Sequence, residues 1–308
     1  MVDVAWYRTL NDEHLERVRQ LLLAVCEVDG RPEVPDHGLP AEFRGGMHAL
    51  ATAGNELVGY AHLNTAGDAF GHQVGELFVR PDHRCRGLGH RLIVELTRHA
   101  GATEGSGDRL RLWAHGNLPA AAVLAARHGF VPVRELRRMR LEMATEPPAP
   151  RVPGGVRLRA FRPGSDEPPV ARVNARAFSW HPEQAALTAE DIAATEAEEW
   201  FDPDGFLLAE RDGTLVGFHW TKVHKRAAGD TSGQPMGEIY VIGVDPEAHG
   251  GGLGKALTLA GLRYLHQSGL RQAMLYVESD NTAAVAMYER LGFIPWDSDV
   301  QYGRRPGS

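Results

Sequence analysis

The chain has 308 residues, beyond the size at which one hydrophobic core usually stops growing, so we expect two domains of about 150 residues. With 43% hydrophobic and 24% charged residues and no apolar run of about 18 residues, it is typical of soluble globular proteins and no membrane partner is expected. The net charge of -7 argues against a nucleic-acid partner. The N-terminus lacks a secretion signal, which favours a cytoplasmic location.

The residues able to bind metals or form disulfides are sparse or scattered. Cys26 and Cys85 are too few for a disulfide framework or a cysteine-based zinc site, and this fits a reduced cytosol. The fifteen histidines show no spacing typical of metal ligands. We therefore expect no metal. A monomer is also expected, independently of this pattern.

The first half of the chain alternates strand and helix signals. Asn11 is a favourable N-cap, and Asp12 and Glu13 follow it in the first turn of a helix. Gly54-Asn55 joins two alternating runs and predicts a hairpin. The expected order is a strand at 4–7, a helix from 11, strands at 47–53, 57–64 and 75–79, a glycine loop, a helix to about 100, a strand at 109–114, a helix at 119–127 and a strand from 130.

Segment 144–155 is rich in proline and glycine and predicts a linker between domains at 1–143 and 156–308. The same order of signals recurs after it, which indicates an internal repeat. The expected elements are a strand at 156–159, helices at 166–178 and 189–199, a hairpin over 205–211 and 215–224, a strand at 238–244, a glycine loop at 250–254, a helix at 255–268, a strand at 272–277, a helix at 282–291 and a strand from 293.

This order predicts the α/β (α+β) class, with two tandem folds that are each a mixed, mostly antiparallel sheet flanked by helices. In both halves one strand leaves through a proline, turns on glycines and opens a helix, over 79–92 and 244–257. Free backbone N–H groups and the helix dipole make such a turn an anion site suited to a pyrophosphate. One such loop is weak evidence, but its repetition in the same context is strong. Neither loop is a dinucleotide fingerprint or a nucleotide P-loop.

The two loops resemble the acetyl-CoA pyrophosphate motif of the GNAT acetyltransferase superfamily. Arg84-x-x-Gly87-x-Gly89 matches it, and His249-x-x-Gly252-x-Gly254 matches it with His in place of the usual Gln or Arg. Segment 280–293 resembles the second cofactor segment of the superfamily, in which Asn281 and the next helix contact the pantetheine arm. The resemblance implies cofactor contacts from Leu77, Phe78, Val79, Arg84, Cys85, Arg86, Gly87, Leu88, Gly89, Ile242, Gly243, Val244, His249, Gly250, Gly251, Gly252, Leu253, Gly254, Lys255, Asn281, Thr282, Ala283, Ala284, Val285 and Ala286.

Longer runs resemble the mycothiol synthase family over essentially the whole chain. The most specific are 181–184 (His-Pro-Glu-Gln) and 219–222 (His-Trp-Thr-Lys), and 199–205, 237–241 and 275–281 add to them. The resemblance implies transfer of acetyl from acetyl-CoA to the cysteinyl amine of Cys-GlcN-inositol. It further implies that the acceptor is bound by Asp36, Glu183, Lys222, Glu238 and Tyr276.

The two halves differ at the residues that the chemistry needs. When the two halves are aligned on their Gly-Phe pairs, the position of Tyr288 in the second half corresponds to about Ala125 in the first. Counting back from the proline of each glycine loop places Glu76 opposite Val241 rather than Glu238. We expect catalysis in the second half, with Glu238 as the base and Tyr288 as the proton donor to the leaving thiolate. Backbone N–H groups around 242–244 would stabilise the oxyanion, with Gly243 marking a bulge.

Other interpretations remain open at this stage. The chain could acetylate another small amine or a peptide N-terminus, or bind CoA without catalysis. Glu238 could be an ordinary solvated residue and Tyr288 a packing residue. Arg137, Arg138 and Arg140 alternate along a strand and are expected to form a solvated face. Neither cysteine lies in a nucleophile context, so direct transfer is expected rather than an acyl-enzyme.

Overall fold

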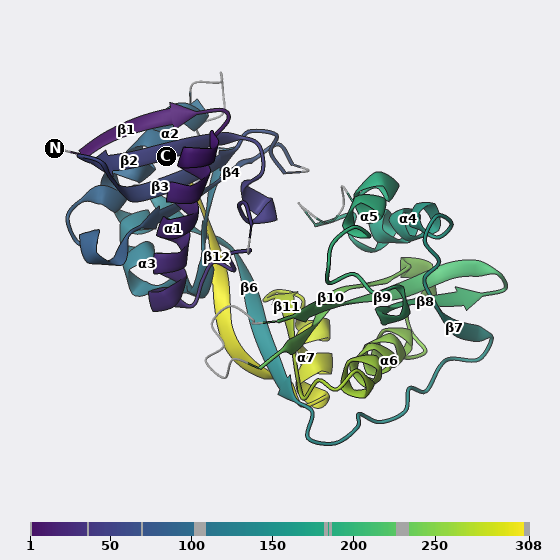
Figure 1. Cartoon of the computed structure of the whole chain (residues 1–308). Coiled ribbons are helices and arrows are strands. Elements are labelled where there is room, and N and C mark those ends of the chain that lie inside the picture. The colour runs from purple at the N-terminus through teal and green to yellow at the C-terminus, as the bar shows by residue number, and fades with distance from the viewer. Residues whose placement is uncertain are drawn as a thin grey trace. The chain divides into compact units, whose positions relative to one another are not determined.

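The computed structural model describes residues 2–35, 37–68, 70–101, 109–181, 184, 187–225 and 234–304, and it divides the chain into two compact units (Figure 1). The first unit comprises Met1–Leu136 and the chain end from Asp297, and the second comprises Arg137–Ala227 and Gly233–Trp296. Two long strands change unit along their length: β6 (Phe130–Glu142) and β12 (Ile294–Arg304). The division therefore comes before segment 144–155, and residues 297–304 belong to the first unit.

The first unit is a sheet with helices on both faces. Its strand order is β1-β2-β3-β4-β5 followed by the end of β12, which pairs antiparallel with β5 through Val300 and Ala114. Strands β1 to β4 are antiparallel, whereas β4 and β5 are parallel. The elements are β1 (Val2–Tyr7), α1 (Asp12–Asp29), β2 (Met47–Ala53), β3 (Glu56–Asn64), β4 (Gln73–Val79), α2 (Leu88–Gly101), β5 (Leu110–Ala114) and α3 (Pro119–Arg127).

Two hydrophobic clusters hold these helices to the sheet. Leu92 and Leu96 of α2 pack with Leu112 and Phe130 on one face. Val18 and Leu22 of α1 pack with Tyr60 on the other, as Figure 1 shows for the two sets of helices. Asn11 accepts a hydrogen bond from the N–H of His14, at 2.8 Å, which confirms the predicted start of α1.

The second unit repeats the arrangement, with strand order β6-β11-β10-β9-β8-β7. Here β10 and β11 are the parallel pair, and β7, β8, β9 and β10 are antiparallel. The elements are β7 (Val156–Ala160), α4 (Glu167–Ala177), α5 (Ala189–Thr195), β8 (Phe206–Arg211), β9 (Thr214–His224), β10 (Met236–Val244), α6 (Leu253–Gln267), β11 (Gln272–Glu278) and α7 (Thr282–Arg290). The mixed sheets flanked by helices confirm the predicted fold class.

Some local predictions were wrong, and the reasons are physical. Helix α6 begins at Leu253 rather than 255, because Gly252 adopts a left-handed conformation (φ 82°) and acts as the N-cap. Arg138 does not lie on a solvated face but is fully buried, with its guanidinium 3.8 Å from the ring centre of Trp296. Among the residues that the structure describes, no helix combines the length and apolar character needed to cross a membrane.

Candidate functional site

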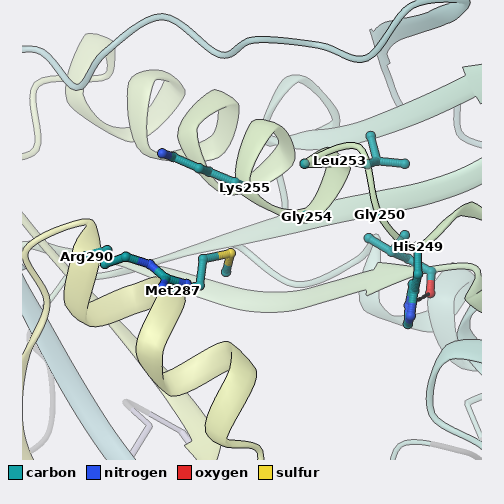
Figure 2. Close-up of a pocket in the computed structure, with 9 residues that line it drawn as sticks. His249, Gly250, Leu253, Gly254, Lys255, Met287 and Arg290 are labelled. Atoms are coloured by element: carbon teal, nitrogen blue, oxygen red, sulfur yellow. Dashed lines mark hydrogen bonds between the residues drawn. The ribbon is translucent and has the colours of Figure 1, made fainter.

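The glycine turn of the second unit opens on a pocket of about 390 Å³, a size typical of small-molecule sites. Gly250 and Gly252 have φ values of 89° and 82°, which side chains other than glycine rarely adopt. A Cβ atom at either position would meet no heavy atom within 4 Å, so the turn presents bare backbone to open space. The residues that line the pocket are Val244, His249, Gly250, Gly252, Leu253, Gly254, Lys255, Met287 and Arg290 (Figure 2).

The charge of this pocket fits an anionic ligand. Lys255 and Arg290 are exposed, and neither forms an ion pair with any residue in the described part of the chain. The first turn of α6 adds backbone N–H groups that lack helical partners, at the positive end of the helix dipole. These residues therefore fit the diphosphate of a CoA thioester.

His249 retains one contact that arginine makes in the first unit. Its Nε2 donates to the carbonyl oxygen of Val244 at 3.1 Å, and Nε of Arg84 donates to the carbonyl oxygen of Val79 at 3.2 Å. Arg84 also pairs with both carboxylate oxygens of Asp29, at 2.8 and 2.6 Å. Histidine therefore still braces the turn against the preceding strand, and its contact with the cofactor stays a prediction.

The loop of the first unit differs from that of the second. Cys85, at φ 59°, stands where the second unit has Gly250, so a side chain occupies a left-handed position there. Leu88 is buried, and Leu77 and Val79 pack into the core of the first unit. Gly87 keeps a φ of 83°, and a Cβ at Gly89 would meet Leu124 at 3.0 Å.

A second group of polar residues lies on β9 and β10. Glu238 is buried, and its Oε2 accepts a hydrogen bond from Nε2 of His224 at 2.7 Å. Lys222 is the direct partner of Glu238 across the two strands. The Lys222 ammonium lies 5.1 Å from the ring centre of Trp200 and 5.6 Å from that of Tyr240. Tyr276 packs in the neighbouring cluster with Met274, which pairs with Glu238 in the parallel ladder.

The bulge in β10 lies at Tyr240, so its expected position at Gly243 was wrong. Ile239 pairs with Thr221 and Val241 with Trp220, which leaves Tyr240 as the extra residue. Gly243 pairs regularly with Phe218, and a Cβ there would approach the Phe218 ring to 2.7 Å. Close packing, rather than a bulge, explains the glycine.

Tyr288 lies on α7, with its ring 5.7 Å from that of Phe293. Burial raises the pKa of its hydroxyl well above the ordinary value, so the phenol remains protonated at neutral pH. Within the described residues this hydroxyl forms no hydrogen bond. It is therefore available as a proton donor.

The remaining predicted residues fall into three groups. The side chain of Asn281 caps α7 by accepting from the N–H of Ala284 at 3.2 Å. Val285 is buried in the core, whereas Thr282 and Ala283 are exposed. Asp36 and Glu183 lie outside the described residues.

Sequence reasoning missed five residues: Met287, Arg290, His224, Trp200 and Tyr240. Trp200 and Tyr240 stand in runs that carried the family resemblance, and Arg290 follows Met287 at helical spacing, three residues later. Their importance depends on which face of a strand or helix they occupy. Spacing alone did not single them out.

Comparisons with known proteins agree with this geometry. The sequence model of the Acetyltransferase (GNAT) family matches residues 15–130 and 174–293. The chain is 55% identical over 304 residues to a mycothiol acetyltransferase from Amycolatopsis mediterranei, covering 98% of this chain and 99% of that protein. It is 54% identical to one from Saccharomonospora viridis, covering 99% of each.

Two solved structures share the fold along nearly the full length. A GCN5-related N-acetyltransferase from Sphaerobacter thermophilus matches with a TM-score of 0.70 and 25% identity, over 99% of this chain and 97% of that one. A tandem GNAT protein from the clavulanic acid biosynthesis pathway matches with a TM-score of 0.69 and 20% identity, over 100% of this chain and 99% of that one. The second likeness concerns the fold alone.

Proposed function

The chain belongs to the acetyltransferase (GNAT) family, and from this premise we propose that it transfers the acetyl group of acetyl-CoA to the cysteinyl amine of Cys-GlcN-inositol, giving mycothiol. It is an acyltransferase of mycothiol biosynthesis, as its relatives at 46–55% identity are. GNAT acetyltransferases use acetyl-CoA as the acetyl donor. The observation that carries the proposal is the second unit's glycine turn beside the cations Lys255 and Arg290, which have no ion-pair partner among the described residues.

The donor is held by this turn. Backbone N–H groups of Gly250 to Gly254 bind the diphosphate, and Lys255 and Arg290 supply positive charge around it. When bound, acetyl-CoA supplies an activated acyl group as a thioester. Ladder pairing between β10 and β11 covers Gly237 to Ile239 and ends at the Tyr240 bulge. Backbone N–H groups beyond the bulge are the candidates to stabilise the oxyanion.

Glu238 and Tyr288 divide the proton transfers. The acceptor amine must be neutral to attack, and Oε1 of Glu238, which has no hydrogen bond within the described residues, takes its proton. The free hydroxyl of Tyr288 donates a proton to the departing thiolate. Lys222, whose ammonium lies over the rings of Trp200 and Tyr240, contacts the hydroxyl-rich part of the acceptor.

The described part of the first unit holds no equivalent set, so we propose that this unit is non-catalytic. Strand pairing places Asn64 and Val74 where the second unit has Lys222 and Glu238, and α3 has Ala125 where α7 has Tyr288. Its glycine loop remains suited to CoA. We further propose that the chain acts as a monomer on a small-molecule acceptor.

A panel of acceptors tests the substrate. Purified protein is incubated with acetyl-CoA and either Cys-GlcN-inositol, GlcN-inositol, simple amines or short peptides, and the acetylated products are quantified by mass spectrometry. We expect a kcat/KM for Cys-GlcN-inositol well above that of every other acceptor. Similar values across the panel would reject the assigned acceptor, although not the acetyltransferase chemistry.

A further inference from the structure

We propose that His224 is a positioning residue for the catalytic base: it holds Glu238 away from Lys222, so that the carboxylate stays free for the acceptor amine. The inference rests on the proposed function, in which Glu238 is that base. Histidine at this position has no role in the chemistry set out above.

The strand register places opposite charges face to face. Lys222 and Glu238 are direct partners across an antiparallel pair, and such partners have Cβ atoms about 5 Å apart. An ion pair is the ordinary outcome for lysine and glutamate in this relation. Within the described residues, however, Lys222 forms no ion pair.

Each charge is instead held by another group. The Lys222 ammonium lies over the rings of Trp200 and Tyr240, where cation–π attraction stabilises it. His224, two residues further along β9, points to the same face and donates to Oε2 of Glu238.

The burial of the His224–Glu238 pair makes this contact strong. Their side chains are 4% and 8% exposed, so little water competes for the hydrogen bond. The 2.7 Å separation is at the short end of the range for N–H···O hydrogen bonds. Because Oε2 is engaged, the carboxylate is fixed in orientation and Oε1 is the oxygen left for the substrate.

Without His224, the carboxylate has a new partner within reach. Glu238 would turn toward Lys222, and the ion pair would stabilise its charged form and occupy the oxygen that the amine needs. Loss of His224 should therefore lower kcat while leaving the binding of acetyl-CoA unchanged, since the donor pocket contains neither residue.

The test compares His224→Leu and His224→Gln with the parent enzyme and with Glu238→Gln, using Cys-GlcN-inositol as acceptor. We expect His224→Leu to lower kcat at least about 10-fold. His224→Gln keeps an N–H donor and should retain most of the activity. Calorimetric titration with acetyl-CoA verifies that each variant is folded. Equal loss in the Leu and Gln variants would overturn the positioning role.

The double variant His224→Leu/Glu238→Gln completes a cycle. If His224 acts only through Glu238, the double variant is no slower than Glu238→Gln alone. A further loss in the double variant would show an independent structural role and overturn the inference. A fully active Glu238→Gln variant would instead contradict the proposal that Glu238 is the base. If Glu238→Gln is impaired but His224→Leu is fully active, only the positioning role of His224 is rejected.

Discussion

The two units share one fold but differ in how the charged side chains of their central strands are paired. In the second unit, Glu238 and Lys222 face each other across two strands, but Glu238 pairs with His224 rather than with Lys222, and β10 bulges at Tyr240. In the first unit, β4 pairs with β3 without a shift, and Glu76 stands where the bulged strand has Tyr240 and Val241. Because β10 contains one extra residue, positions counted back from the proline of each glycine loop correspond in the two units only as far as the bulge. On the far side of the bulge the correspondence shifts by one residue.

Glu76 belongs to a closed network of charges. His115 lies 3.1 Å from Glu76 and 3.1 Å from Asp299, and Arg31 pairs with Asp299 and Asp297. Burial would lower the pKa of His115, but the two carboxylates outweigh it and raise the pKa to about 10. Burial would likewise raise the pKa of Asp299, but His115 and Arg31 lower it to about 2. The paired charges of the first unit hold β12 against that unit. Lys222 and Glu238 of the second unit are not paired with each other and remain available for chemistry.

The largest effect should come from Glu238→Gln, which removes the base without changing the size of the side chain. We expect kcat to fall by about 100- to 1,000-fold, the usual contribution of a general base. Glu76→Gln is the matched control in the first unit and should leave kcat nearly unchanged. Steady-state acetylation of Cys-GlcN-inositol measures both, and an equal loss in the control would break the comparison.

Tyr288→Phe should come next, with kcat about 10- to 100-fold lower because the leaving thiolate loses its proton donor. Since the hydroxyl forms no hydrogen bond within the described residues, the urea midpoint of unfolding should hardly change. The variant's affinity for acetyl-CoA, measured by calorimetry, should equal that of the parent. An unchanged kcat would remove Tyr288 from the mechanism.

His115→Gln tests the network of the first unit and should cost roughly 2 kcal/mol at pH 7, because two carboxylates lose a charged partner. In the parent, the raised pKa of His115 gives stability that is present below pH 6.5 and lost as the pH rises through about 10. Urea unfolding between pH 7 and 10 should therefore slope downward in the parent and less so in the variant. His128→Gln, at a half-buried histidine outside this network, is the control, and a His115→Gln variant as steep as the parent would contradict the assignment.

Arg290→Ala should weaken the binding of acetyl-CoA about 10-fold, as expected for one charge-assisted contact to a phosphate. Arg127 occupies the same place on α3 of the first unit. Arg127→Ala should leave the KM for acetyl-CoA in the acetylation reaction unchanged. A larger effect from Arg127 would assign the working donor site to the first unit.

The smallest effect concerns a pair of carboxyl groups in the second unit. Burial, and then the hydrogen bond with Glu167, raise the pKa of Glu196 to about 7. Its stabilising contribution is present below about pH 4.5 and lost as the pH rises through 7, the range in which the first unit's His115 changes little. Glu196→Gln should remove this change, which we expect to be below about 1 kcal/mol, from urea midpoints measured at pH 5 and 7. A variant that retains the full slope would exclude Glu196 as its source.

Local signals in the sequence predicted most of the architecture. The cap at Asn11, the turn at Gly54-Asn55 and both glycine loops depend on residues close together in the chain, and the structure places each of them as expected. The repeat of these signals predicted two copies of one fold. The family resemblance then led to Glu238 and Tyr288 as candidates.

What only the tertiary structure decided depends on contacts between distant residues. The bulge at Tyr240, the bond from His224 to Glu238 and the burial of Arg138 against Trp296 each follow from how strands align and which face a side chain occupies. The return of Asp297 onward to the first unit follows from pairing with β5. Composition and spacing determine which turns and helices form, but the register between strands selects which charges meet, because a shift of one residue turns every following side chain to the other face.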